Sequence, residues 1–314
     1  MDTRIGQPAH LPVLYQQIIH ALRPHSPGFY VDGTVGAGGH AAGILEASFP
    51  EGHLLGLDVD PQALALAHQR LLPYGERAKV IQASYTTLRR QLDTLGWKGI
   101  AGIVVDLGVS SMQIDTPERG FSFQMDGPLD MRFRTDQGLT AADLIDQSSE
   151  EDLANILWRY GDEQLARKIA RAMVQDRPFR TTLELANMIA RIYGARRGHI
   201  HPATRTFQAL RIAVNKELDS LSEFLPQAVE ALEPGGRLAV ISFHSLEDRI
   251  VKQYFRLESR DCICPPEIPV CTCNHRASIV EVSRRPIEAD EEEILRNPRS
   301  RSARLRVAEK LDLA

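Results

Sequence analysis

The stretch that most constrains the fold runs from Tyr30 to His40, where an apolar segment ends in Asp32 and breaks into a glycine-rich turn before a helical pattern begins. Glycine has no Cβ, so such a turn adopts backbone angles closed to other residues and lets main-chain N–H groups approach a ligand closely. The pattern predicts a strand, a tight turn and a helix start. It is typical of an α/β protein in which the turn faces a bound molecule.

A second acidic residue narrows the kind of molecule. The strand pattern Leu54–Leu57 is followed by Asp58, 20 positions after Gly38, which is the spacing at which a carboxylate accepts hydrogen bonds from ribose hydroxyls. The turn lacks the G-x-G-x-x-G spacing that holds a dinucleotide pyrophosphate, because its glycines stand at 33, 36, 38 and 39. An acidic residue at the end of the first strand favours S-adenosylmethionine as the cofactor. Thr34 stands where many methyltransferases have their first glycine.

A third carboxylate, Asp106, follows the apolar run Ile100–Val105. Strands separated by helical patterns predict a parallel sheet, and ligands of such sheets bind beyond the carboxyl ends of the strands. We therefore expect Asp32, Asp58 and Asp106 to converge on one crevice. The predicted fold class is α/β, with a class I (Rossmann-like) methyltransferase sheet closed by an antiparallel pair at 277–282 and 303–308.

Composition excludes several classes of protein. Of 314 residues, 43% are hydrophobic and 25% are charged, which is ordinary for a globular protein and argues against a disordered or fibrous chain. No apolar run reaches the roughly 18 residues of a membrane span. The first residues, with Asp2 and Pro8, lack the basic and apolar regions of a signal peptide. We expect a cytoplasmic protein without membrane contacts.

The charge distribution points to particular segments. The net charge of −4 argues against a general nucleic-acid binder. However, residues 159–216 contain twelve Lys or Arg against four Asp or Glu, and residues 296–306 contain five Arg and no acid. Two interpretations stay open: a basic face that meets phosphates, or solvated helices with a charged tail.

The strand pattern stops between Asp115 and about Asn215, and amphipathic helical segments replace it. We predict helices at 150–160, 162–175, 182–193 and 204–221. The expected domains are a discontinuous S-adenosylmethionine-binding domain, 1–114 and 216–314, and an inserted helical substrate-recognition domain, 115–215.

All four cysteines lie in one short segment, as Cys262-Ile263-Cys264 and Cys271-Thr272-Cys273. Four thiols can hold a tetrahedral Zn²⁺, although C-x-C pairs are less usual than C-x-x-C pairs in structural sites. Two disulfides do not suit a reducing compartment. The alternatives left open are a zinc knuckle and a reduced loop stiffened by prolines, and no metal ligand is assigned to the functional site.

Several motifs together resemble one family, the S-adenosylmethionine-dependent ribosomal RNA small subunit methyltransferase H family, whose members modify a cytosine N4 of 16S rRNA. The matching segments span nearly the whole chain in order: residues 10–14, 32–40, 106–111, 118–123, 126–132, 201–209, 242–249 and 297–302.

The resemblance implies an enzyme that transfers a methyl group from S-adenosylmethionine to the exocyclic amine of one cytidine in the decoding region of bacterial 16S rRNA. The partner it implies is 16S rRNA within the small ribosomal subunit, and not DNA. The cofactor contacts that it implies are Gly38, Gly39, His40, Asp58, Tyr85, Asp106 and Gln113.

Chemistry suggests roles for some of these residues. A cytosine amine is a poor nucleophile, so its alignment at about 3 to 3.5 Å from the methyl group matters most. Asp106 is the candidate catalytic residue, as hydrogen-bond acceptor and positioner, and a purely cofactor-binding carboxylate is its alternative role. His244 is a second candidate for contacting the base or taking a proton, or else a structural histidine.

RNA recognition suggests further candidates. Phe121, Phe123 and the stretch 132–134 are candidates for stacking on an unstacked base, with core packing as the alternative for both phenylalanines. Arg205, Arg211 and Lys216 are candidates for phosphate contacts, with a solvated helix face as the alternative.

Three rival functions remain at this point. The first is a catalytically silent binding protein that assists ribosome assembly, and intact Asp58, Asp106 and glycine motifs argue against it. A nicotinamide dehydrogenase is disfavoured by the glycine spacing. A DNA amino-methyltransferase is weakened because Asp106-Leu107-Gly108-Val109 stands where such enzymes have an acid or amide followed by two prolines and an aromatic residue.

Overall fold

The chain divides into two units in the computed structural model, which describes residues 12–194, 201–265 and 270–312. Unit 1 comprises Met1–Gly108 and Asp219–Ala314, and unit 2 comprises Val109–Leu218. The insertion expected at 115–215 begins and ends inside unit 2. Each unit has a hydrophobic core of its own side chains.

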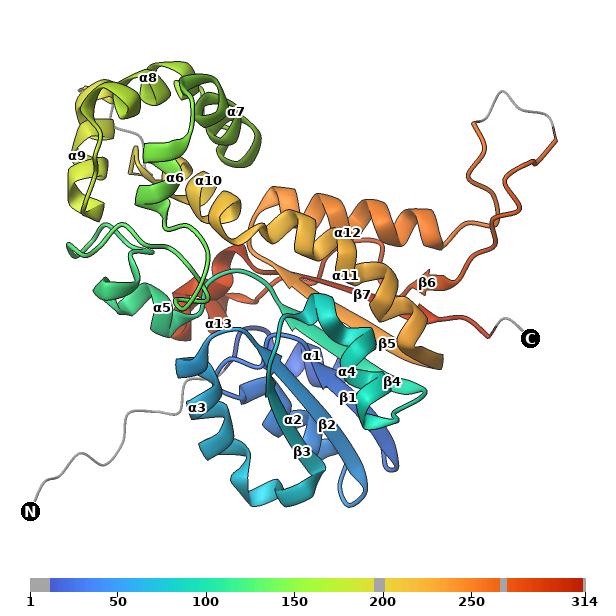
Figure 1. Cartoon of the computed structure of the whole chain (residues 1–314). Coiled ribbons are helices and arrows are strands. Elements are labelled where there is room, and N and C mark those ends of the chain that lie inside the picture. Colours follow the sequence, from blue (N-terminus) through green and yellow to red (C-terminus); the bar gives the residue numbers. More distant parts are fainter. Residues whose placement is uncertain (1–11, 195–200, 266–269, 313–314) are drawn as a thin grey trace, which may run out of the picture. The chain divides into compact units, whose positions relative to one another are not determined.

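A seven-stranded sheet organises unit 1 (Figure 1), with the strand order β3-β2-β1-β4-β5-β7-β6. The first five of these strands are parallel, and β7 runs antiparallel to both β5 and β6. Their bounds are β1 Gly28–Asp32, β2 Gly52–Asp58, β3 Ala78–Gln82, β4 Ile100–Asp106, β5 Leu232–Ser242, β6 Ile279–Glu281 and β7 Arg304–Lys310. The predicted α/β fold and its closing antiparallel pair are confirmed.

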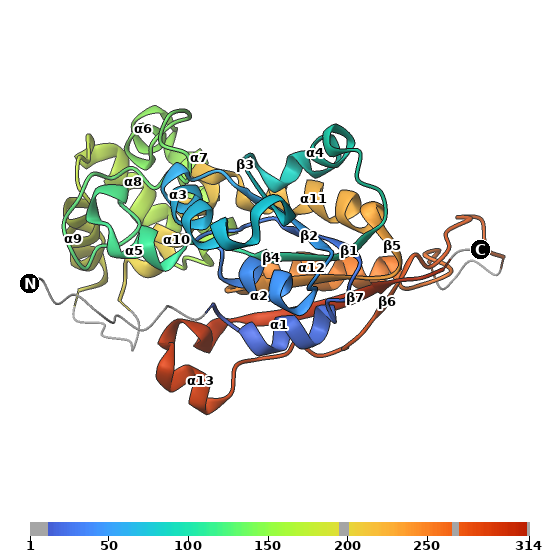
Figure 2. The same ribbon diagram turned by 90° about the horizontal axis from the view of Figure 1, so that it is seen from below.

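Helices cover both faces of this sheet. Figure 2 shows α1 and α2 on one side of the strands and α4 and α11 on the other. Successive side chains of a strand point to opposite faces of the sheet. In β1, Tyr30 therefore packs in the core on the side of α1 and α2, and Val31 packs in the core on the side of α4 and α11. The helices on the first side are α1 Tyr15–Leu22, α2 Gly39–Ala47 and α3 Pro61–Leu71, and those on the second side are α4 Leu88–Leu95, α11 Glu217–Ala231 and α12 Ser245–Glu258.

The C-terminal part of unit 1 is joined closely to its beginning. Helix α13, Glu291–Arg296, supplies Glu293, whose Oε1 accepts a hydrogen bond of 2.6 Å from the backbone N–H of Leu14. Its Oε2 lies 3.3 Å from Nε2 of Gln17, which donates to it. Leu14 has φ 54° and no capping side chain of its own, so Glu293 satisfies a backbone donor at the start of α1.

Unit 2 consists mainly of helices around one apolar core. Their bounds are α5 Ser111–Asp115, α6 Ala141–Gln147, α7 Glu150–Gly161, α8 Ala166–Asp176, α9 Thr182–Tyr193 and α10 Thr204–Asn215. Helix α9 has the bounds predicted from the sequence. Helix α8 begins later than expected, because Asp162 has φ 48° and ends α7 in the left-handed region.

The single helix predicted at 204–221 is wrong. Lys216 has φ 51° and separates α10 from α11. Polar contacts favour the break: Arg211 forms a bidentate ion pair with Glu217 at 2.8 and 2.9 Å, and Nδ2 of Asn215 donates to the carbonyl of Met131 at 2.8 Å. These contacts link residues distant in sequence, so the hydrophobic periodicity did not reveal them.

Candidate functional site

The glycine-rich turn after β1 is tied to both neighbouring strands. The Gly33 N–H donates to the carbonyl of Val104 in β4 at 2.8 Å, and the Val35 N–H donates to that of Leu57 in β2 at 2.9 Å. A Cβ on Gly33 would lie 2.7 Å from Cγ1 of Val105, which leaves no room for a side chain. The turn therefore lies at the carboxyl ends of β2, β1 and β4, where the strand order reverses and α/β proteins bind ligands.

Three predicted cofactor contacts, Gly38, Gly39 and His40, lie at the start of α2. Gly38 has φ 79° and precedes the helix, and a Cβ on Gly39 would lie only 2.4 Å from Cγ of Pro12. His40 is buried with its Nε2 3.0 Å from the carbonyl of Val13, and burial lowers its pKa to about 4. These three residues shape the turn, and their contacts with a cofactor stay predictions.

Two carboxylates flank this turn. Asp32 is 1% exposed, and its Oδ1 accepts a hydrogen bond from the Thr34 N–H at 3.2 Å. Burial, together with the smaller effect of the nearby Asp58 charge, raises its pKa to about 7. The Asp58 carboxylate accepts from the N–H groups of Gly36 and Asp60, each at 2.9 Å, and burial raises its pKa as well. Asp58 thus fixes the turn from the end of β2.

Asp106 differs from Asp32 and Asp58 in having a buried side-chain oxygen without a hydrogen-bond partner in the described part of the chain. Its backbone N–H donates to Oγ1 of Thr34 at 2.6 Å, so the threonine in the glycine turn holds the end of β4. Its Oδ1 is buried and has no hydrogen-bond partner among the described residues. Burial, together with the smaller effects of the Asp32 and Glu247 charges, raises the pKa of Asp106 to about 8.

Together these carboxylates favour a positively charged ligand. Their pKa values are raised mainly because burial disfavours the charged forms, and repulsion from neighbouring carboxylates adds to the effect. A cation beside them would stabilise those charged forms, whereas a pyrophosphate would be repelled. The strand pattern predicted that Asp32, Asp58 and Asp106 lie near one another, but it did not predict that their pKa values are raised.

Glu247 was not singled out from the sequence. It lies 2% exposed in the first turn of α12, and its Oε2 accepts a hydrogen bond from the Phe243 N–H at 2.9 Å. His244 caps the same helix, with Nδ1 3.4 Å from the Glu247 nitrogen and Nε2 3.2 Å from Glu247 Oε1. A glutamate three residues after the cap was the available signal, but histidine is an unusual capping residue. These contacts favour the structural role of His244.

Tyr85 lies shortly after the end of β3, directly after Ser84. Its half-buried ring meets Phe224 edge to face, with ring centroids 5.0 Å apart and an interplanar angle of 74°. Its Cβ would lie 3.3 Å from a Cβ on Gly33, which places Tyr85 beside the glycine turn. Contact with an adenine stays a prediction.

The candidates in unit 2 have structural partners. Gln113 is 5% exposed, and its Oε1 accepts from the Ser110 N–H at 3.0 Å in a capping box. Phe121 stacks on Phe133 with ring centroids 5.6 Å apart, and Phe123 meets Phe207 edge to face. These contacts favour core packing for both phenylalanines, while base stacking stays a prediction.

The basic candidates in unit 2 differ in their surroundings. Arg211 is paired with the buried Glu217, whereas the exposed Arg205 donates to the carbonyl of Asp162 at 3.2 Å. An exposed guanidinium with one backbone contact retains donors for a phosphate. Arg205 and Lys216 are therefore the better candidates.

We expect Asp32→Asn to change how stability depends on pH. The raised pKa of Asp32 stabilises the folded protein fully below the unfolded pKa near 4, and this contribution is lost as pH rises through about 7. Asparagine keeps the Oδ1 acceptor for Thr34 but does not titrate. The free energy of unfolding of the variant, measured by urea denaturation relative to wild type, should therefore rise by about 2 kcal/mol between pH 5 and pH 7.

The free energies of unfolding of the variant and the wild type must be compared at the same pH, because other groups also make stability depend on pH. His40 acts in the opposite direction, because its lowered pKa favours folding as pH rises from about 4 towards its ordinary range. Asp93→Asn, on the exposed surface of α4, is the matched control for the loss of one carboxylate. If the difference in free energy of unfolding between Asp32→Asn and wild type does not change between pH 5 and pH 7, the prediction is wrong.

Among the described residues, no helix is both long and apolar enough to cross a bilayer.

Comparison with known proteins gives a consistent result. The model of the MraW methylase family matches residues 7–311. Ribosomal RNA small subunit methyltransferase H of Dehalococcoides mccartyi is 51% identical over 302 residues, which cover 96% of this chain and 86% of that protein. Proteins of the same name from Thermomicrobium roseum and Geotalea uraniireducens are each 50% identical over 96% of this chain, and over 94% and 98% of their own lengths. The family identified from the motifs is confirmed, and the chain belongs to the MraW methylase family.

Proposed function

We propose that this protein transfers a methyl group from S-adenosylmethionine to the N4 amine of one cytidine in 16S rRNA within the small ribosomal subunit. Its relatives carry the name ribosomal RNA small subunit methyltransferase H. The single observation that carries the chemistry is the buried Oδ1 of Asp106, which has no hydrogen-bond partner among the described residues, at the end of β4.

The residues around the glycine turn fit S-adenosylmethionine. When bound, this cofactor would supply a methyl group on a positively charged sulfur. Asp58 lies at the end of β2, where a carboxylate accepts from ribose hydroxyls, and Tyr85 offers a ring to the adenine. Asp106 and Asp32 would have their carboxylate forms stabilised by positive charge, which agrees with a sulfonium and an amino group and not with a pyrophosphate.

Asp106 is suited to act on the amine. Its Oδ1 would accept a hydrogen bond from the exocyclic nitrogen and so orient the lone pair of that nitrogen. The nitrogen carries an additional proton once it has formed its new bond to carbon, and Oδ1 would take that proton. A carboxylate with a raised pKa is a better proton acceptor than an ordinary one, provided that the positive charge of the bound cofactor keeps it ionised before the transfer.

Unit 2 is proposed to recognise the RNA. Residues 159–216 carry its excess of positive charge, and Arg205 is exposed there. Lys216, in the left-handed break after α10, is a further candidate for contact with phosphate. Such contacts would make binding weaker as salt concentration rises.

The first test is methyl transfer to small ribosomal subunits that lack the modification. Labelled S-adenosylmethionine would be incubated with these subunits or with naked 16S rRNA, and the product nucleoside identified by mass spectrometry. We expect N4-methylcytidine at one position. Modification of another base or another atom would overturn the proposed target, and cofactor binding without transfer to either substrate would favour a binding protein.

A further inference from the structure

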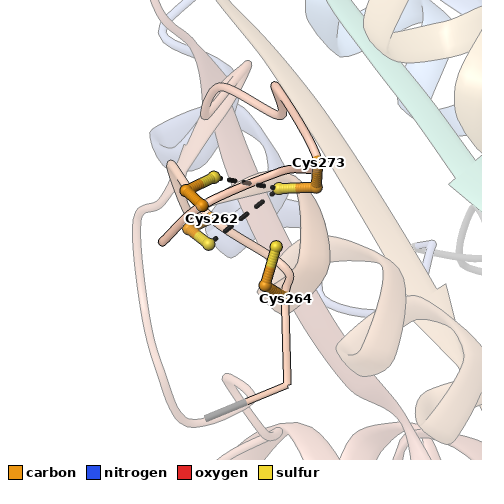
Figure 3. Close-up of side chains that lie close together, drawn as sticks. Cys262, Cys264 and Cys273 are labelled. Carbon is orange, nitrogen blue, oxygen red and sulfur yellow. Dashed lines mark hydrogen bonds between the residues drawn. The ribbon is translucent and has the colours of Figure 1, made fainter. Parts of the chain in front are cut away.

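The four cysteines form a cluster that the methyl-transfer site does not use. They lie in unit 1, on the segment that leaves the end of α12 and returns to β6 (Figure 1). All four thiols are unbridged, and their Sγ atoms all lie within 4.8 Å of one another. Figure 3 shows the sulfur atoms of Cys262, Cys264 and Cys273 turned towards a common centre.

The base of this segment is held together by hydrogen bonds. The Ser278 N–H donates to the carbonyl of Glu258 at 2.8 Å, and the Ala277 N–H donates to Oδ1 of Asp261 at 3.2 Å. Nδ1 of His275 lies 2.8 Å from the carbonyl of Arg260. These contacts join the residues that precede Cys262 to those that follow Cys273. The two C-x-C pairs are therefore brought together by the fold.

The sulfur positions match a mononuclear tetrahedral site. Zinc bound by four thiolates at about 2.3 Å has sulfur atoms about 3.8 Å apart. Here Sγ of Cys273 lies 3.5 Å from that of Cys271 and 3.9 Å from that of Cys262. The Ile263 N–H also donates to Sγ of Cys273 at 3.5 Å, as backbone amides do to metal-bound thiolates. Only small movements would place all four sulfurs around one ion.

We propose that Cys262, Cys264, Cys271 and Cys273 bind one structural Zn²⁺ ion. Four sulfur ligands select zinc or iron, and one compact set of four suits a single ion better than a polynuclear cluster, which spreads its cysteines over different irons. Each thiol that binds as a thiolate releases one proton. The ion crosslinks both arms of an exposed segment whose apolar side chains, Ile263 and Val270, are 41% and 71% exposed and so supply little core of their own.

Metal analysis of the full-length protein tests the proposal. Protein purified under reducing conditions without chelator, and then exposed to Zn²⁺ and desalted, should contain about one zinc per chain. Cys271→Ser combined with Cys273→Ser should lower the zinc content at least about 10-fold. Val270→Ala, at an exposed neighbouring position, is the control and should retain the zinc.

Two further measurements identify the ion and its ligands. Co²⁺ in place of Zn²⁺ should give the intense sulfur-to-metal absorption of a tetrahedral thiolate site, and bound Zn²⁺ should slow alkylation of all four cysteines. The proposal is overturned if the wild type retains no zinc, if the double variant retains as much as wild type, or if the protein holds iron that Zn²⁺ does not replace. The same experiments leave methyl transfer untouched as a separate question.

Discussion

Replacing Asp106 with asparagine is expected to lower the rate of methyl transfer at saturating substrates by about 100-fold or more. Asparagine fills the same space and still accepts a hydrogen bond, but it does not take a proton. The folded protein should be stabilised at neutral pH, as for Asp32→Asn, because asparagine replaces a buried carboxyl group whose pKa is raised to about 8. Transfer to small subunits, measured with labelled methyl donor, gives kcat and KM.

The division between kcat and KM separates the two roles left open for Asp106. A catalytic carboxylate predicts a fall in kcat that excess methyl donor does not restore. A purely cofactor-binding carboxylate predicts a raised KM for the donor and a kcat close to wild type. Asp93→Asn, exposed on α4, should keep the full rate. Recovery of the variant's rate at high donor concentration would refute the catalytic assignment.

Asp248→Ala is expected to destabilise unit 1 by about 3 to 5 kcal/mol. Asp248 in α12 receives hydrogen bonds from Nε and Nη2 of Arg306 in β7, at 2.6 and 3.2 Å. Arg306 is 4% exposed, and its Nη1 has no partner among the described residues. Removal of the carboxylate would leave a buried guanidinium without its counter-charge. Urea denaturation followed by circular dichroism measures the loss.

A double replacement distinguishes the lost charge from lost packing. Asp248→Leu with Arg306→Met removes both charges and keeps most of the volume, so it should recover most of the stability lost in Asp248→Ala. Arg89→Ala, which breaks an exposed ion pair with Glu230 at 2.7 Å, should cost about 1 kcal/mol or less. A cost of similar size for Asp248→Ala would show that the buried pair contributes no more than a surface pair.

Local patterns predicted the elements that depend on local interactions. Helix α9, Thr182–Tyr193, has the predicted bounds, and its start is fixed locally by a capping box between Thr181 and Glu184. The helix at 204–221 failed because a distant contact, between Asn215 and Met131, favours a break that the hydrophobic pattern does not encode. The order of the last strands in the sheet was not predicted either, since β7 lies between β5 and β6 although it follows both in sequence.

The site was predictable in its residue types and less so in its electrostatics. The acidic residue at each strand end identified Asp32, Asp58 and Asp106, because parallel strands bring their carboxyl ends together. Burial of these groups depends on the helices that pack around them, so the raised pKa values did not follow from the spacing. Glu247 was missed for the same reason: its influence on Asp106 is exerted through space.

The hydrogen bonds from Leu14 and Gln17 to Glu293 have a consequence for biosynthesis. A ribosome makes a protein from its N-terminus, so α1 leaves the exit tunnel long before its capping partner exists. Strand β5 is likewise synthesised before β7, the strand that pairs with its second edge. During that interval the nascent chain exposes an unpaired strand edge, a feature that invites wrong pairing. Completion of this sheet is thus a late event in translation, because β7 is the last strand in the sequence.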